Sequence, residues 1–150
     1  MGALSELVTE DRVILHRTVD DWRQAIAAVA APLIADGSIT PAYVQSMIRA
    51  VEEFGPYIVL VPHIALAHAR PEGAVNRQAM SVMTLAEPVD FGHTENDPVS
   101  IVFCLAATDS RSHMDALKSF VAIAGDAART ARLVAATTVE EFHQILDEVD

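Results

Sequence analysis

The nine-residue stretch Val99–Ala107 has the sequence VSIVFCLAA and is apolar at every position except Ser100. A run of this kind is typical of a strand at the centre of a sheet whose two faces are both covered. Two further strands are predicted at Met80–Leu85 and Arg12–Val19. The extended apolar segment Tyr57–Val61 then leads into PHIALAHARP, residues 62–71. These segments predict one strand in the first part of the chain and three or four strands from Tyr57 onward.

Two helices are expected between the first strand and Tyr57. Thr18 is the predicted N-cap of the first, which Gly37 ends. The second opens at Thr40-Pro41, because proline is favourable at the first helical position, and ends at Gly55-Pro56. The apolar positions recur at helical spacing: Trp22, Ile26, Val29 and Leu33 in the first helix, and Val44, Met47, Ile48 and Val51 in the second.

The C-terminal third predicts two or three more helices. Ser112 with Asp115, and Thr138 with Glu141, match the capping-box pattern at helix starts, and Asp126 is a candidate cap between them. The expected buried faces are Met114, Leu117, Val121 and Ala124 in the first of these helices, and Phe142, Ile145, Leu146 and Val149 in the last.

The order of elements predicts an α/β fold, a three-layer sandwich with a mixed sheet covered on both faces. Residues 1–150 are expected to form one domain, because no repeat, low-complexity tract or linker interrupts them. The longest turn-like stretch, Glu87–Pro98, is expected to be a loop.

Composition limits the class of protein. The chain has 51% hydrophobic residues and a net charge of −11, from 10 Lys and Arg against 21 Asp and Glu. Such a chain is neither disordered nor equipped to bind nucleic acid or anionic membranes. No segment approaches a membrane span or a signal peptide, and Cys104, the single cysteine, fits a reducing compartment and a buried core position. We therefore expect a cytoplasmic protein.

Histidines are the best candidates for chemistry, because P-loop, GxGxxG, GxSxG and CxxC motifs are all absent. No cofactor is expected. A metal site would need His63 and His68 together, with His93 as a third ligand. An odd separation puts the first two on opposite faces of an extended strand, so only a turn between them would allow this.

A second histidine pattern fits phosphoryl chemistry. His68 ends an extended segment and is followed by Arg70, whereas His113 falls in the first turn of the helix expected to start at Ser112. The free backbone N–H groups at a helix start favour anions, so these groups are suited to holding a phosphoryl group on nitrogen. The alternative is that His68 is structural or merely exposed. His16 and His143 are expected to be structural.

Three blocks in the same order resemble a known family: GPYIVLVPHIALAHARPEGAV (55–75), LAEPVDFGHTENDPVSIVFCLAA (85–107) and SHMDAL (112–117). The chain resembles, from about Leu15 onward, the IIA component of the bacterial phosphoenolpyruvate-dependent sugar phosphotransferase system. The type is the mannitol/fructose type, in its ascorbate-like branch. The resemblance implies an α/β/α sandwich with His68 as the phosphorylated residue and His113 as the second active-site histidine.

The same resemblance implies the partners. The carrier protein HPr would donate the phosphoryl group, a cysteine of a IIB component would accept it, and a IIC component would be served indirectly; a homodimer is left open. Ala67 stands where the family has a proline, and His63 where relatives have glycine, close enough to join the site. Arg49 is offset from an arginine of the mannitol-type relatives. Arg70 is the expected phosphate-binding residue.

Two alternatives to sugar transport remain at this point. One is a regulatory module of the same fold, phosphorylated on His68 but not coupled to transport. The other is a metal-dependent hydrolase that uses His63, His68 and His93.

Overall fold

A computed structural model describes residues 3–148, and its centre is a mixed four-stranded sheet in the order β1-β3-β4-β2. β3 runs antiparallel to β4, whereas β1 is parallel to β3 and β2 is parallel to β4. The strands are β1 (Val13–Arg17), β2 (Ile64–Ala67), β3 (Ala79–Val89) and β4 (Val99–Ala106). The apolar run at 99–107 is a central strand, as predicted.

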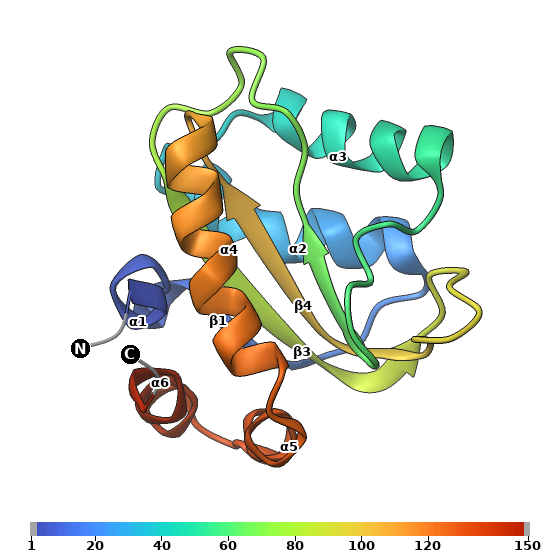
Figure 1. The fold of residues 1–150 in the computed structure, drawn as a ribbon, viewed down its shortest axis with the longest axis vertical. Helices are drawn as coiled ribbons and strands as arrows, with labels where there is room; N and C mark the ends of the chain where they lie inside the picture. The colour runs from blue at the N-terminus through green and yellow to red at the C-terminus, as the bar shows by residue number, and fades with distance from the viewer. Residues whose placement is uncertain (1–2, 149–150) are drawn as a thin grey trace.

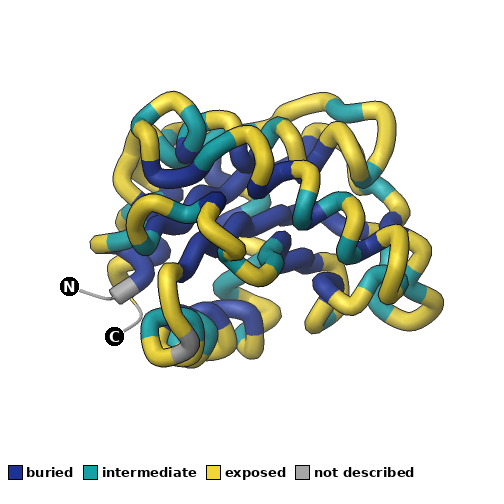
Figure 2. Tube along the Cα trace, turned by 90° about the horizontal axis from the view of Figure 1, so that it is seen from above, coloured by how far each residue is buried: buried dark blue, intermediate teal, exposed yellow. Residues whose placement is uncertain are grey.

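Helices cover both faces of the sheet, which confirms the three-layer sandwich and the single domain (Figure 1). One core lies between the sheet and α2 and α3, and the other between the sheet and α1, α4, α5 and α6. Figure 2 shows the buried strands as a layer between more exposed helices. The helices are α1 (Ala3–Leu7), α2 (Trp22–Ala35), α3 (Pro41–Phe54), α4 (Ser110–Ala124), α5 (Ala127–Ala135) and α6 (Val139–Asp147), with a 3-10 turn at Glu10–Arg12.

The two helices of the first half follow the prediction except at one cap. The N-cap of α2 is Asp21, whose carboxylate accepts from the Gln24 N–H at 2.9 Å, so the prediction of Thr18 was wrong. Asp and Thr are both good N-cap residues, and Asp21, which directly precedes the first helical residue, takes the position. α3 starts at Pro41 and ends before Gly55, whose φ of 86° requires glycine. The predicted apolar faces are buried or packed against the core.

The segment Tyr57–Val61 is not a strand, contrary to the extended conformation expected. Its backbone turns, and the strand that follows is the short β2. Ile58 and Val59 are nevertheless buried, and the Ile58 carbonyl accepts from the Leu66 N–H at 2.8 Å. The segment therefore packs along the outer edge of β2. β3 is also longer than predicted and takes the first residues of the expected loop 87–98.

The start of α4 was predicted wrongly. Its N-cap is Asp109, which accepts from the Ser112 N–H at 2.8 Å, so Ser112 is the third helical residue rather than the cap. The buried face of α4 also differs from the one expected, because Met114 and Val121 are 50% and 56% exposed. The residues of α4 that are actually buried are Ala116, Phe120, Ile123 and Ala124, and Leu117 packs against them as partly buried.

The last two helices and the N-terminal helix complete the second core. Asp126 and Thr138 cap α5 and α6 as predicted. Phe142, Ile145 and Leu146 are buried, while Val149 lies outside the described residues. α1 was not predicted, because a five-residue helix has no period to detect, and tertiary packing of Leu4 accounts for it.

Candidate active site

The parallel pairing of β2 with β4 brings His68 and His113 together. His68 directly follows β2, and α4 begins a few residues after β4. The carboxyl ends of parallel strands meet at the same edge of a sheet, so residues that follow them become neighbours. The two imidazole rings lie 5.5 Å apart between centroids, at 45°. Two histidines distant in sequence thus form one site, at the end of the sheet between α3 and α4 (Figure 1).

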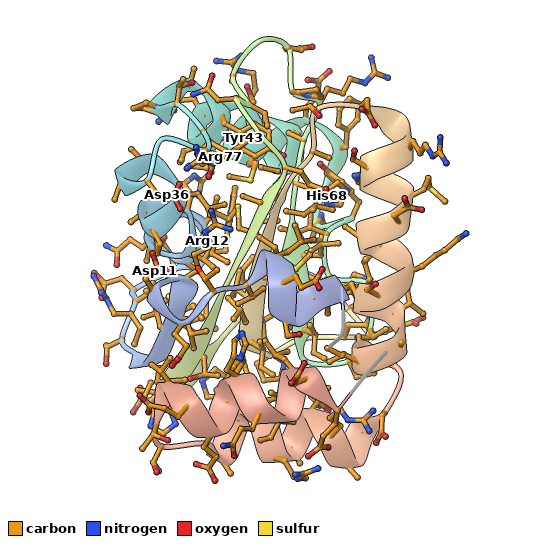
Figure 3. All side chains as sticks on the ribbon, turned by 90° about the vertical axis from the view of Figure 1, so that its left-hand side faces the viewer. Asp11, Arg12, Asp36, Tyr43, His68 and Arg77 are labelled. Carbon is orange, nitrogen blue, oxygen red and sulfur yellow. The ribbon has the colours of Figure 1, made fainter. Side chains whose placement is uncertain are left out.

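The side of the sheet that His68 faces follows from strand alternation. Ile64 and Leu66 of β2 point into the core beneath α4, whereas Ala65 and Ala67 point toward α2 and α3. Successive strand residues alternate between faces, so His68 continues the series of Ile64 and Leu66. The imidazole therefore lies on the α4 side, beside this helix in Figure 3.

One hydrogen bond fixes the tautomer of His68. Its Nδ1 lies 2.7 Å from the Leu66 carbonyl oxygen. A carbonyl oxygen only accepts, so Nδ1 carries the proton in the neutral ring. The Nε2 lone pair is then the nucleophilic one, and the sequence-based expectation of a backbone carbonyl holding one ring nitrogen is confirmed.

The surroundings of His68 favour its neutral form. Burial lowers the pKa of His68, the hydrogen bond to Leu66 acts in the opposite direction, and a charge on His113 lowers the pKa further. The net pKa lies below the ordinary histidine value of 6.5. The ring is therefore uncharged at neutral pH, which a nucleophile requires.

His68 and His113 line a cleft of about 1130 Å³ between α3 and α4. Arg70, an exposed residue after β2, lines it as well. Ionisable residues that the sequence analysis did not assign to the site also line it. They are Arg49, Glu53, Glu72 and Asp109. The helical spacing of Ser46, Arg49, Ala50 and Glu53 along one side of α3 is the signal that could have found this wall.

The N-terminus of α4 is already occupied by an acidic side chain. The Asp109 carboxylate accepts from the Ser112 N–H, and this bond and a further one to Arg111 lower the pKa of Asp109. The His113 N–H donates within the helix to the Asp109 carbonyl. The Ser112 N–H, one of the groups at this helix start that were expected to face a phosphoryl group, is therefore already bonded to the Asp109 carboxylate. Arg49 and Arg70 bring positively charged side chains to the cleft.

His63 and His93 do not join this cleft. His63 precedes β2 and His68 follows it, so about 15 Å of strand separates their backbones. His63 Nδ1 donates to the Pro98 carbonyl at 2.8 Å, and His93 Nδ1 accepts from the Glu95 and Asn96 N–H groups. Among residues 3–148 no cluster of three metal-ligating side chains is found. The structure gives the metal-dependent hydrolase no support.

The remaining residues singled out in the sequence have structural contacts. Nε2 of His16 lies 3.1 Å from the Val134 carbonyl, and Nε2 of His143 lies 2.9 Å from the Ser5 carbonyl. Cys104 is fully buried, and burial raises the pKa of its thiol to about 12, although Ser81 opposes this. These residues stabilise the fold, as expected. No helix in the described part of the chain is long and apolar enough to cross a membrane.

Comparison with known proteins agrees with this geometry. Residues 6–149 match the family "Phosphoenolpyruvate-dependent sugar phosphotransferase system, EIIA 2". The chain belongs to this family. It is 32% identical over 151 residues to the ascorbate-specific PTS system EIIA component of Salmonella typhimurium, covering 100% of this chain and 98% of that protein.

Two solved structures show the same fold. The mannitol-specific cryptic enzyme IIA CmtB of Escherichia coli has a TM-score of 0.87 and 26% identity, over 97% of this chain and 98% of that one. The IIA mannitol enzyme of Escherichia coli, solved in complex with phosphorylated IIB, has a TM-score of 0.83 and 25% identity. That match covers 95% of this chain and 99% of the other.

Proposed function

We propose that this chain is a phosphoryl carrier of the sugar phosphotransferase system, with Nε2 of His68 accepting the phosphoryl group from phosphorylated HPr. It passes the group on to a cysteine of a IIB component. The single observation that carries the proposal is the 2.7 Å contact of His68 Nδ1 with the Leu66 carbonyl, in a ring that opens onto the cleft. The cytoplasm is the compartment that this scheme requires.

The acceptance step forms one bond and breaks one. The Nε2 lone pair attacks the phosphorus of the donor phosphohistidine in line, and the leaving donor imidazole takes the electron pair of the broken P–N bond. His68 keeps its Nδ1 proton, so the phosphorylated ring carries a positive charge that the Leu66 carbonyl stabilises. This charge keeps the new P–N bond labile enough for transfer onward.

Charge in the cleft stabilises the transferring group. The phosphoryl oxygens spread their negative charge in a loose transition state, so cationic donors contribute more than covalent help does. We assign this role to His113 and Arg70, which share the cleft with His68. Neither a metal nor another cofactor is needed for the group to move between nitrogen and sulfur.

The sugar is set by the partners rather than by the carrier, which never contacts it. The ascorbate-specific relatives cover the full length of this chain at 32% identity. We therefore assign the chain to an ascorbate-like system, in which its IIB partner resembles theirs.

A reconstituted relay tests this function. Phosphoenolpyruvate, Enzyme I and HPr together should label the protein with acid-labile phosphate, and adding the IIB component of an ascorbate-type system should remove the label. Labelling in the absence of HPr, or a label that is stable in acid, would contradict the assignment.

A further inference from the structure

The peptide group between His68 and Ala69 is held on both sides by tyrosine hydroxyls. The Tyr57 hydroxyl donates to the His68 carbonyl oxygen at 3.0 Å. On the other side, the Ala69 N–H donates to the Tyr43 hydroxyl at 3.1 Å. A peptide group is planar, so a hold on both its oxygen and its N–H fixes the orientation of the whole plane. The main chain cannot rotate freely just after His68.

Tyr43 forms the rigid half of this clamp. It lies on α3, is 1% exposed, and its hydroxyl donates to the Leu105 carbonyl of β4 at 2.8 Å. Burial raises the pKa of this phenol, so it stays a neutral donor. Tyr43 therefore ties the residue after His68 to the neighbouring strand. Figure 3 shows Tyr43 and His68 in the same half of the molecule.

Tyr57 forms the second half and also touches the imidazole itself. Its ring meets the His68 ring edge-on, with 5.4 Å between centroids and an interplanar angle of 83°. The neighbouring Ile58 carbonyl accepts from the Leu66 N–H, so the backbone next to Tyr57 is fixed to β2, the strand that precedes His68. Tyr57 itself lines the cleft and is 37% exposed.

We propose that Tyr57 is a positioning residue for phosphoryl transfer, which with Tyr43 holds the His68 backbone and ring so that Nδ1 stays bonded to Leu66 and Nε2 stays presented to the cleft. The inference rests on the proposed function of His68. Ala67 and Ala69 have only methyl side chains, which cannot form hydrogen bonds, so the two tyrosine hydroxyls supply the polar contacts that hold this peptide. A ring held in one orientation loses little freedom on reaching the transition state.

Two variants of Tyr57 separate its two contacts. Tyr57→Phe removes only the hydroxyl, and Tyr57→Leu also removes the edge-on ring. We expect the rate of His68 phosphorylation by phospho-HPr to fall about fivefold in Tyr57→Phe and about twentyfold or more in Tyr57→Leu. The phospho-HPr concentration at half-maximal rate should stay unchanged in Tyr57→Phe. The unfolding midpoint should change little in Tyr57→Phe, because the residue is partly exposed.

The Nδ1 proton of His68 gives a readout that needs no partner protein. In the wild type its bond to Leu66 should protect it from exchange with water, giving a resolved NMR signal, which should broaden in Tyr57→Phe and vanish in Tyr57→Leu. Thr130→Ala is the matched control, since the Thr130 hydroxyl also donates to a backbone carbonyl, that of Ala127 at 2.9 Å, but on α5. In Thr130→Ala the His68 Nδ1 signal and the rate of His68 phosphorylation should equal those of the wild type.

Failure of the proposed function and failure of the positioning role of Tyr57 would give different results. If phospho-HPr does not label the wild type, the proposed function fails, while the Nδ1 signal still decides whether Tyr57 positions the ring. If both Tyr57 variants keep the wild-type Nδ1 signal and a rate within about twofold, Tyr57 has no positioning role.

Discussion

The Nδ1 atom of His68 lies 2.7 Å from the carbonyl oxygen of Leu66, two residues earlier in the same chain. Strand β2 therefore supplies the carbonyl that fixes the tautomer of His68, the residue directly after it. Leu66 is the third of the four residues of β2, which pairs with β4, so the backbone that carries this carbonyl is part of the sheet. A rigid acceptor on one nitrogen leaves the other as the only available nucleophile of the ring.

The pH dependence of phosphorylation should reflect the lowered pKa of His68. Burial is the largest cause, and the acid limb of the rate should lie below the pH 6.5 of an ordinary histidine. The rate should be constant above that value. A folded-state pKa below the unfolded one also means that His68 lowers stability as the pH falls through 6.5, because the unfolded chain then binds more protons. Rates of phosphorylation between about pH 5 and 8 check the position of the limb.

Replacing His113 by asparagine tests the electrostatic coupling of the two rings. A charged His113 lowers the pKa of His68, so His113→Asn should raise the pKa of His68 toward its ordinary value. Imidazole NMR titrations of the two proteins measure the difference directly. An unchanged or lower His68 pKa in the variant would mean that the rings, 5.5 Å apart, do not interact electrostatically.

His113 should matter more for transfer to IIB than for acceptance from HPr. We expect His113→Ala to slow transfer to IIB about a hundredfold, the effect of losing a donor worth about 3 kcal/mol in the transition state. Acceptance should be slowed less, because only transfer to IIB starts from a phosphohistidine that ground-state contacts already hold. Single-turnover rates of the two half-reactions make the comparison. Transfer to IIB within about threefold of wild type would show that His113 has no catalytic role.

Asp36 should contribute to stability through ion pairs far from the cleft. Its carboxylate meets Arg12 at 2.9 Å and accepts from the Ser38 N–H and hydroxyl, and Arg77 lies nearby at 3.5 Å (Figure 3). Burial would raise the pKa of Asp36, but these bonds and the Arg12 charge together lower it. Asp36→Asn should reduce the free energy of unfolding by about 2 kcal/mol at pH 7.

Denaturant titration of Asp36→Asn beside Asp20→Asn checks this prediction. Asp20 is exposed and its carboxylate accepts from the Gln24 side-chain amide at 3.1 Å, so its replacement should cost less than about 0.5 kcal/mol. A carboxyl with a lowered folded pKa stabilises the fold above its ordinary pKa of 3.8 and loses that effect as the pH falls further. The difference in free energy of unfolding between Asp36→Asn and the wild type should therefore become smaller in acid. A difference that does not change with pH would contradict the ion-pair explanation.

The net charge of −11 should make association with HPr depend on salt. If the donor surface is basic, long-range attraction steers the encounter, and salt screens charges more than about 10 Å apart at 0.1 M. The association rate should fall at least about threefold between about 0.05 and 0.5 M salt. Stopped-flow fluorescence measures it. A flat profile would mean that the charge serves solubility only.

The sequence predicted those features that depend on local patterns. The apolar run of β4 and the Pro41 and Gly55 boundaries of α3 were visible because each has a period or a backbone requirement of its own. His68 was visible through its motif. The start of α4 was missed because Asp109 and Ser112 are both residue types that suit a cap.

Contacts between distant residues could not be predicted in this way. The hydroxyls of Tyr43 and Tyr57 reach the peptide after His68 from α3 and from the segment beside β2, which only the folded chain brings together. Local sequence gives no signal for these contacts. For Arg49 the helical spacing along α3 marks the face to which it belongs, but how that face packs against the sheet is set only in the folded chain.

The site of labelling tests the central claim most directly. After incubation with phosphoenolpyruvate, Enzyme I and HPr, ³¹P NMR of the wild type should show one phosphohistidine bonded through Nε2 of His68. His68→Ala should carry no label while keeping its fold by circular dichroism, and His63→Asn, which alters the exposed histidine at the other end of β2, should be labelled like the wild type. Full labelling of His68→Ala, or loss of the label in His63→Asn, would contradict the account.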